Sequence, residues 1–408
     1  FTPERYRALL ALLDQRAGTP VKFRVSETPC FLPQSLIGRL AATGADLLGQ
    51  LIENAEYRKT SDAAIPTEFN VRNEAPRPLF AAVDFNLIRK AGELEPRLIE
   101  LQGFPSLYGF QTVFAQAYID AYQLDPSLRF IADGADLETY YARLRRAIVA
   151  DHDPANVVLL EIHPREQKTL PDFLVTERIT GIRTVCITEV QREGKRLYYT
   201  REGKRTLIQR IYNRAIVDEI VRKGVVLPFR FTDELDVEWA GHPNWFFRIS
   251  KFSLPFLKHP CVPRTWFLAA LSEWPADLEN YVLKPLYSFA GLGVIVGPSR
   301  ADLESLPRER RRDYILQERM RFEPVIETPH GPTQAEIRVL YIHREENEPI
   351  ERSRPRYDLH ESRVTSHESR SRWHLGPVIV RMGRGKMMGV DHNRDLQWVG
   401  ASAGLIAD

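Results

Sequence analysis

Hydrophobic residues near the start of the chain recur at helical spacing. Residues 3 to 14 and 34 to 57 repeat apolar side chains three or four positions apart, as in Leu36, Ile37 and Leu40, and this period predicts amphipathic helices. Similar spacing predicts two further helices, from Ser106 to about Asp125 and from Ala135 to Ala150.

Two strand-like runs, "RPLFAAVDFNLIRK" and "GELEPRLIELQGF", surround the turn signal Lys90-Ala91-Gly92-Glu93 and predict a β-hairpin. If its turn centres near Glu93, Asp84 lies opposite Gln102 and Asn86 lies opposite Glu100. These four polar residues then share one face, with cross-strand Cβ distances of about 5 Å, and apolar residues occupy the other face.

The pattern changes after Asn156. The runs "VVLLEI", "RTVCITEV", "KRLYYT" and "LIQRIYNR" predict short strands, and "TLPDFLVTERIT" predicts a helix capped by Thr169. This alternation is typical of a small α/β unit with a partly parallel sheet, placed at about 156 to 225. A helix is expected near Trp266 to Trp274. The later runs "YVLKPLYSFAGLGVIVGP", "DYILQERM", "AEIRVLYIH" and "PVIVRMGRG" predict a mainly antiparallel sheet.

Residues 344 to 372, "REENEPIERSRPRYDLHESRVTSHESRSR", interrupt that sheet and contain almost no apolar side chain. Such a segment cannot bury enough surface to order itself, so the simplest interpretation is a flexible insert. Two alternatives remain: an arginine-rich contact with phosphate or nucleic acid, and a sequencing or reading-frame artefact between strand-like flanks.

The composition limits the class of protein. A chain of 408 residues is too long to fold around one ordinary hydrophobic core, so two or three domains are expected. With a net charge of +2, the chain lacks the overall positive field that marks a nucleic-acid-binding protein. Three distant cysteines show no metal-ligand or disulfide spacing, which favours a reduced, cytoplasmic setting. No apolar run approaches the roughly 18 residues of a membrane span, and the N-terminal stretch does not resemble a signal peptide.

The polar face of the hairpin is a candidate metal site. Asp84 and Glu100 supply carboxylates, Gln102 supplies a carboxamide oxygen, and the hairpin has no basic residue on that face. Hard oxygen ligands of this kind favour Mg²⁺, which also takes phosphate oxygens. The alternative interpretation of the hairpin alone is a solvated strand face.

A lysine and a glycine-bearing loop point to phosphate binding. Lys284 ends a strand, and the loop from Ser288 to Gly293 returns to another strand, so the order is the inverse of a P-loop. The loop resembles a flap over phosphates, with Lys284 as a point charge. An ordinary hairpin turn is the alternative.

Other strands carry candidate ligands with weaker local signals. The end of "DYILQERM" could present backbone groups to an adenine edge, and Glu336 and Arg338 lie two apart on one strand face. Lys251 and Arg214 are candidate anion ligands, as is Lys386 in a glycine-flanked strand end. Isolated surface basic residues are the alternative for each.

The order of these motifs resembles the circularly permuted ATP-grasp ligases, the group of glutathionylspermidine synthase and the eukaryotic type of glutathione synthetase. The resemblance rests on "AVDFNL", "LIELQGFPSLYG", "LIQRIYNR", "RISKFSLPFL", "YVLKPLYSFAGLG", "YILQERM", "AEIRVLYI" and "GRGKMMGV…GASAGL", and covers roughly residues 79 to 408. It implies an α/β (α+β) ATP-grasp fold with mainly antiparallel sheets. Residues 1–155 would hold the helices and metal hairpin, 156–240 an inserted α/β substrate domain, and 241–408 the nucleotide and lid region.

The resemblance also implies the activity and the site. ATP would phosphorylate a carboxylate, and an amine would attack the acyl phosphate to give an amide. Magnesium would bind Asp84, Glu100 and Gln102, and catalysis would involve Lys284, Arg338 and Arg214, the last within a Tyr-x-Arg strand. The expected ATP contacts are Lys251, Lys284, Ser288, Gly291, Gly293, Gln317, Glu318, Met320, Glu336 and Lys386. The partners would be a small carboxylate and an amine, and the sequence leaves open whether the chain forms a homodimer.

Two positions depart from the family pattern. Ala82 stands where glutathionylspermidine synthases carry an arginine, and Ser288 stands where glutathione synthetases keep a metal-binding glutamate. A nucleotide-binding protein without ligase turnover is therefore a second hypothesis. A polyanion binder that uses residues 308 to 312 and 344 to 372 is a third.

Overall fold

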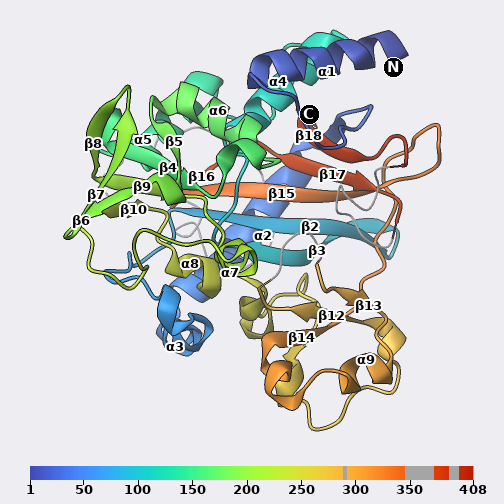
Figure 1. Ribbon diagram of the computed structural model, residues 1–408. Helices are drawn as coiled ribbons and strands as arrows, with labels where there is room; N and C mark the ends of the chain where they lie inside the picture. The colour runs from blue at the N-terminus through green and yellow to red at the C-terminus, as the bar shows by residue number, and fades with distance from the viewer. Residues whose placement is uncertain (288–291, 345–371, 386–394, 408) are drawn as a thin grey trace.

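A mixed sheet forms the centre of the computed structural model, which describes residues 1–287, 292–344, 372–385 and 395–407 (Figure 1). Its strands lie in the order β1 (Cys30–Pro33), β18 (Gly400–Ala407), β17 (Ile379–Gly383), β15 (Gln334–His343), β2 (Phe80–Lys90) and β3 (Glu93–Gln102). Strand β16 (Trp373–Leu375) also pairs with β15. Among the described strands of this sheet, only β1 and β18 pair in parallel. The expected hairpin of β2 and β3 is confirmed, within a mainly antiparallel sheet.

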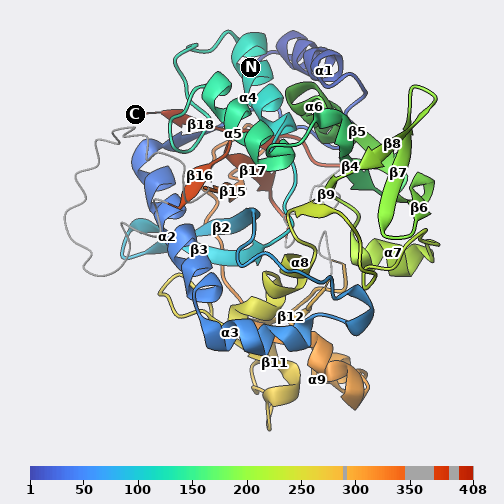
Figure 2. The ribbon, with the colours of Figure 1, turned by 90° about the vertical axis from the view of Figure 1, so that its left-hand side faces the viewer.

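Helices cover both faces of the central sheet because alternate strand residues are apolar on each face. Helix α2 (Gln34–Ile52) packs on the face of Val83 and Tyr341. A Cβ on Gly44 of α2 would lie 2.0 Å from the Tyr341 hydroxyl oxygen, so this close approach needs glycine. On the opposite face pack α1 (Pro3–Ala17), α4 (Phe110–Tyr122) and α5 (Leu137–Val149). Figure 2 shows α2 on one side of the sheet, with α1 and α4 above it.

The expected α/β unit is confirmed as a four-stranded parallel sheet. Its order is β10 (Glu238–Ala240), β9 (Arg210–Asn213), β4 (Val157–Glu161) and β5 (Arg183–Cys186), with α6 (Leu170–Thr180) and α7 (Val217–Lys223). A small antiparallel sheet extends from it, built from β6 (Gln191–Glu193), β7 (Arg196–Arg201) and β8 (Lys204–Ile208). Thr169 does precede α6, but its side chain makes no capping hydrogen bond.

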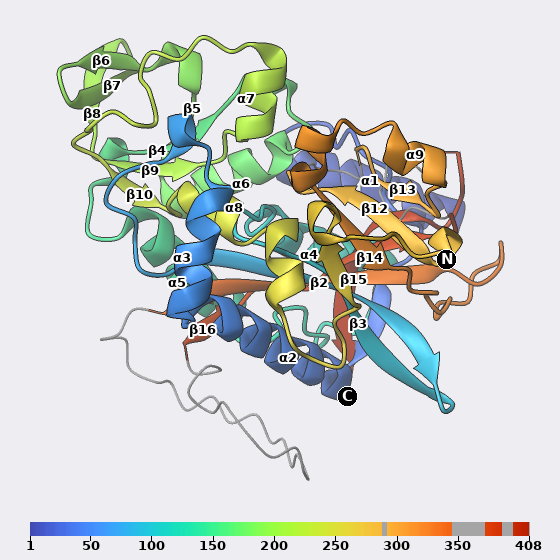
Figure 3. The ribbon, with the colours of Figure 1, turned by 90° about the horizontal axis from the view of Figure 1, so that it is seen from below.

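A separate four-stranded sheet lies below the central sheet in Figure 1 and at the upper right in Figure 3. It contains β11 (Thr265–Phe267), β14 (Tyr314–Glu318), β12 (Tyr281–Pro285) and β13 (Ile295–Val296), followed by α9 (Arg300–Glu304). The expectation of one sheet from all the later strands was therefore wrong. Strands β12 to β14 form this small sheet, whereas β15 to β17 join the hairpin in the central sheet.

Two helix predictions also need correction. The helix expected near Trp266 to Trp274 is strand β11 and a 3₁₀ turn, Leu268–Ala270, because Trp266 and Phe267 pair with β14. The helix expected over 34 to 57 ends at Ile52, and Asn54 caps a new helix, α3 (Ala55–Thr60). Residues 345–371, which hold nearly all of the expected insert, lie outside the described residues. Among the described helices none is long and apolar enough to cross a membrane.

Candidate functional site

One face of the central sheet carries a cluster of charged residues next to the apolar residues that the helices cover. On this face Ala82, Leu340 and Ile379 pack against α4 and its neighbours. Two residues farther along each strand the same face carries Asp84, Arg338 and Arg381 in place of apolar residues. The cluster also includes Glu100 on β3 and Glu336 on β15, opposite Asp84 and Arg381 respectively.

The register of the hairpin differs from the sequence prediction. Asp84 lies opposite Glu100, and Ala82 lies opposite Gln102. The prediction placed the turn too late: Ala91 and Gly92 form a two-residue turn with φ values of 50° and 87°, which suits a hairpin turn. A β-bulge after Asp84 shifts the register once more. Asp84 and Glu100 are therefore direct partners across the hairpin.

Guanidinium groups bind the Asp84 carboxylate on both oxygens. Arg338 donates from Nε to Oδ1 and from Nη2 to Oδ2, each at 2.6 Å. Arg381 on β17 donates to Oδ2 at 3.0 Å and also pairs with Glu336. The expectation of no basic residue on this face was thus wrong, because β15 and β17 supply arginines that the hairpin sequence does not reveal. Arg381 was missed, although its inward position in an apolar strand was a usable signal.

Two lysines from other elements approach Glu100. Lys251, the first residue of the 3₁₀ segment Lys251–Phe256, lies 3.5 Å from the Glu100 carboxylate. Lys284 on β12 donates to Gln317 Oε1 on β14 at 2.6 Å, and its charge acts on Glu100. The Gln102 amide donates to Glu100 at 2.7 Å. A small pocket beside this group is lined by Glu100, Gln102 and Lys251, among others.

Burial and charge shift the pKa values of three groups in this site. Burial would raise the pKa of Glu100, but Lys251, Arg338 and the neighbouring cations lower it to about 2. Burial lowers the pKa of Lys284 to about 8, despite the attraction of Glu100. Burial raises the pKa of Glu336 to about 7 against the effect of Arg381. Such opposed shifts within one cluster are typical of functional sites.

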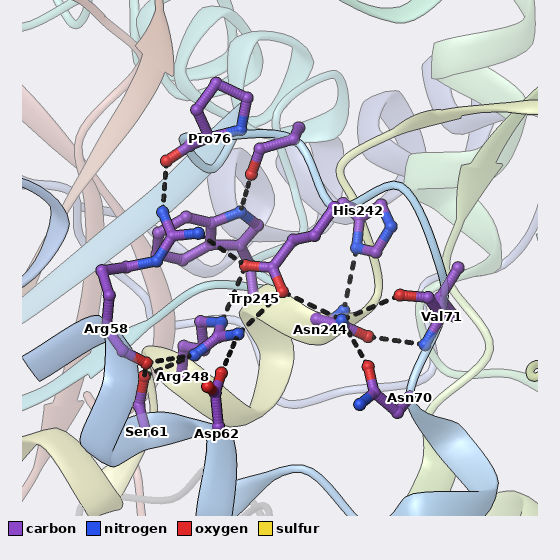
Figure 4. Close-up of polar contacts among 12 residues, drawn as sticks. Arg58, Ser61, Asp62, Asn70, Val71, Pro76, His242, Asn244, Trp245 and Arg248 are labelled. Atoms are coloured by element: carbon purple, nitrogen blue, oxygen red, sulfur yellow. Dashed lines mark hydrogen bonds and ion pairs between the residues drawn. The ribbon is translucent and has the colours of Figure 1, made fainter. Parts of the chain in front are cut away.

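A second ion cluster, which we call the clamp, surrounds the buried Arg248 and fixes the segment that carries Lys251 (Figure 4). Its charged residues are Arg58, Asp62, Glu74 and Arg248. Arg248, at the end of helix α8 (Asn244–Arg248), donates to both Glu74 oxygens at 2.7 and 2.9 Å and to Asp62 at 2.6 Å. Arg58 donates to Glu74 at 3.2 Å. The clamp thus holds α8 three residues before Lys251.

Further contacts from Asn244 and Trp245 tie the loop at residues 70–76 to the same helix (Figure 4). The Asn244 amide nitrogen donates to the Val71 carbonyl at 3.0 Å and to Glu74 at 2.9 Å, and the Trp245 indole donates to the Ala75 carbonyl at 3.1 Å. The Arg58 guanidinium lies 4.7 Å from the Trp245 ring centre. No sequence motif singled out these residues, because their partners are about 170 positions away.

Arg214 supports the turn that follows β3. It is buried after β9, donates to the Phe104 carbonyl at 3.3 Å and the Pro105 carbonyl at 2.6 Å, and stacks on the Phe104 ring. Asp172 on α6 accepts the backbone N–H groups of Leu107, Gly109 and Phe110. Arg214 therefore lines the expected substrate side of the site, but its described contacts are with the chain itself.

Several expected ATP contacts lie apart from the charged cluster or outside the described residues. Glu318 pairs with the exposed Arg264 at 2.7 Å, on the opposite strand face from Gln317. Met320 follows β14, and Gly293 occupies a turn with a φ of 72°. Ser288, Gly291 and Lys386 lie outside the described residues.

The predicted metal ligands fit Mg²⁺ unequally. Asp84 does not fit, because guanidinium groups occupy both oxygens. Glu100 and Gln102 fit better: they line the pocket beside Lys251, and Mg²⁺ often needs only one or two protein carboxylates when phosphates and water complete its shell. Within the described ranges, no group of three or more His, Cys, Asp and Glu residues is arranged to hold a metal.

Comparison with known proteins identifies a similar fold. No family model and no curated protein matches the sequence. Among solved structures, a glutathione synthetase-like effector from Globodera pallida in its apo form is similar over 99% of this chain and 96% of that chain, with a TM-score of 0.57 and 13% sequence identity. At this identity the likeness concerns the fold alone. The mixed α/β architecture is therefore similar to a glutathione synthetase-like fold.

Proposed function

We propose that this protein is an ATP- and Mg²⁺-dependent ligase that joins a carboxylate to an amine through an acyl phosphate. The observation that carries this proposal is the convergence of Lys251 and Lys284 on Glu100 at the junction of the two sheets. The two lysines come from different elements, so they can bind a polyphosphate from two sides. The fold likeness supports the proposal without assigning chemistry.

The reaction consists of two steps, a phosphoryl transfer and an acyl transfer. A carboxylate oxygen of the first substrate attacks the γ-phosphorus of ATP, and ADP leaves. The amine nitrogen then attacks the acyl carbon, phosphate leaves, and the nitrogen loses one proton. Magnesium held by Glu100 and Gln102 would neutralise phosphate charge.

The described side chains have distinct roles in this scheme. Lys251 and Lys284 bind phosphate oxygens, where positive charge stabilises the transferring group electrostatically. Arg338 and Arg381 face the same cluster from the sheet and add permanent charge, because a guanidinium does not deprotonate in proteins. Gln317 positions Lys284 through their 2.6 Å hydrogen bond. Arg214 positions the turn at 104–105, beside which the substrate carboxylate would lie.

Nucleotide titration of the wild type and Lys284→Met tests the binding step. We expect calorimetry with ATP and MgCl₂ to show binding to the wild type and at least tenfold weaker binding to the variant. Lys195→Met is the matched control, because Lys195 pairs with Glu234 on the exposed surface of the α/β unit and should leave the affinity unchanged. Equal affinity of all three proteins, or no ATP binding by the wild type, would contradict the proposal.

A second candidate is a nucleotide-binding protein without ligase turnover. The commitment of Asp84 to two arginines favours it, as does Ala82 in place of the family's arginine. Release of ADP in the presence of mixed amino acids and amines separates the two functions. ADP release that depends on both a carboxylate and an amine supports the ligase, whereas ATP binding without release supports the second candidate.

A further inference from the structure

The Asp84 carboxylate has little capacity left for a metal ion. Its side chain is fully buried, and its oxygens accept hydrogen bonds from Arg338 Nε, Arg338 Nη2, Arg381 Nη2 and the Gln102 amide at 2.6, 2.6, 3.0 and 3.4 Å. The two bonds from Arg338 form a bidentate pair, which is both directional and strong. A metal ion at Asp84 would have to displace at least one guanidinium from a buried carboxylate.

The charges around Asp84 also oppose a free cation. The cluster contains four cations, Lys251, Lys284, Arg338 and Arg381, and three carboxylates, Asp84, Glu100 and Glu336. Four positive and three negative charges leave a net charge of +1. Protonation of Glu336, whose pKa burial raises to about 7, would add to this excess. A bare divalent ion is therefore repelled, whereas a polyphosphate supplies the missing negative charge.

We propose that Arg338 and Arg381 take the place of a metal ion at Asp84, so that this site binds one divalent cation, at Glu100 and Gln102, and only together with a polyphosphate. The nucleotide part of this inference rests on the proposed function. The two guanidinium groups then supply permanent positive charge to the phosphates from the central sheet. The single metal ion supplies positive charge from the pocket lined by Glu100 and Gln102.

Mn²⁺ binding, measured by the loss of the free-ion electron paramagnetic resonance signal, tests this arrangement without activity. The wild type should bind no Mn²⁺ alone and one ion per chain with a non-hydrolysable ATP analogue. Asp84→Asn and Glu100→Gln are matched variants, because each converts a carboxylate of facing residues to a carboxamide. We expect Asp84→Asn to change the Mn²⁺ affinity of the nucleotide complex by less than twofold and Glu100→Gln to weaken it at least tenfold.

A gain of metal binding gives an independent test that needs no nucleotide. The double variant Arg338→Met/Arg381→Met exposes Asp84 beside Glu100, and we expect it to bind Mn²⁺ alone; adding Asp84→Asn should abolish this binding. A thermal unfolding transition establishes that each variant folds. If the double variant does not fold, the comparison of Asp84→Asn with Glu100→Gln decides whether Asp84 binds the metal ion.

The outcomes separate this inference from the proposed function. Mn²⁺ binding by the wild type alone that is lost in Asp84→Asn, or two ions per chain with the nucleotide analogue, would overturn the inference and leave a nucleotide site standing. Failure of the analogue to bind would refute the proposed function, and the double and triple variants with Mn²⁺ alone would still decide whether the arginines exclude a metal from Asp84.

Discussion

Two ion clusters of this protein, the clamp around Arg248 and the cluster around Asp84, differ in their balance of charge. The clamp pairs two arginines with two carboxylates, and Arg248 also donates to the Arg58 carbonyl and the Ser61 hydroxyl. The cluster on the central sheet has four cations for three carboxylates. Only the sheet cluster lies beside the pocket of Glu100 and Lys251.

This difference in charge balance indicates a structural role for the clamp and a functional role for the sheet cluster. A buried ion cluster whose hydrogen bonds are satisfied resists the loss of any member, because the remaining charge would be buried without a partner. A cluster with an excess of positive charge gives up stability, and such clusters are typical of ligand sites. We therefore interpret the clamp as the support of Lys251 and the sheet cluster as the binding surface.

The largest expected effect comes from removing one arginine of each cluster. Arg248→Met should lower the free energy of unfolding by about 3–5 kcal/mol, because it leaves the Glu74 carboxylate buried without its main partner. Arg381→Met should cost about 1 kcal/mol, because Arg338 still binds Asp84 and Glu336 already tends to hold its proton. Urea unfolding monitored by fluorescence measures both. Equal losses of stability would remove the distinction between the clusters.

The next effect concerns the contact that joins the two clusters. Gly103, directly after β3, donates to the Ile249 carbonyl at 2.8 Å, and a Cβ on it would lie 2.2 Å from the Trp245 carbonyl oxygen. Gly103→Ala should therefore push the hairpin away from α8, at a cost of about 1–3 kcal/mol, and separate Lys251 from Glu100. We expect weaker ATP binding by calorimetry.

Gly92→Ala is a control for this change at the other end of the same hairpin. Its Cβ would meet nothing within 4 Å, but its φ of 87° strains any residue other than glycine. It should lower the stability without changing ATP affinity. If Gly103→Ala binds ATP as well as Gly92→Ala does, the clamp does not position Lys251 through this contact.

Much of the fold could be predicted from local patterns, whereas the pairing of distant segments could not. The hairpin turn, helices α1, α4 and α5, and the parallel α/β unit follow from periodicity and turn residues within short windows. The predicted register of the hairpin was wrong, because the two-residue turn and the β-bulge each shift which residues pair. The split of the later strands into two sheets depends on tertiary pairing, such as Phe85 with Ile337, which leaves no local signal.

The candidate site shows the same limit. Asp84, Glu100, Lys251, Lys284 and Arg338 were found from strand position and motif order, and the structure brings their side chains into one cluster. The sequence could not show that Arg338 and Arg381 bind Asp84, because this requires β15 and β17 to lie beside β2. Of the charged residues in the clamp only Arg248 lies in one of the motifs, as the first residue of "RISKFSLPFL".

The smallest expected effect for a single pH unit is a pH dependence to which the sheet cluster contributes through Glu336. The pKa of Glu336 is raised to about 7 by burial, with Arg381, Asp84, Arg338 and Glu100 as its charged neighbours. Between about pH 4.5 and 7 the folded state therefore holds a proton that the unfolded state has lost, so stability should fall as pH rises, by at most about 1.4 kcal/mol per pH unit.

Glu336→Gln isolates this proton from the rest of the cluster. The variant should show a shallower decline between pH 4.5 and 7 in urea unfolding, whereas the share of Glu161, whose pKa burial raises to about 8, should remain. It should keep the opposite trend below pH 4.5, where Glu100, with its pKa lowered to about 2, releases its proton more readily in the folded state. The arginines of the clamp do not titrate in this range, so the clamp contributes no such slope through them. A decline that persists unchanged in Glu336→Gln would show that Glu336 holds no such proton in the folded state, and the whole slope would then come from other buried carboxyls such as Glu161.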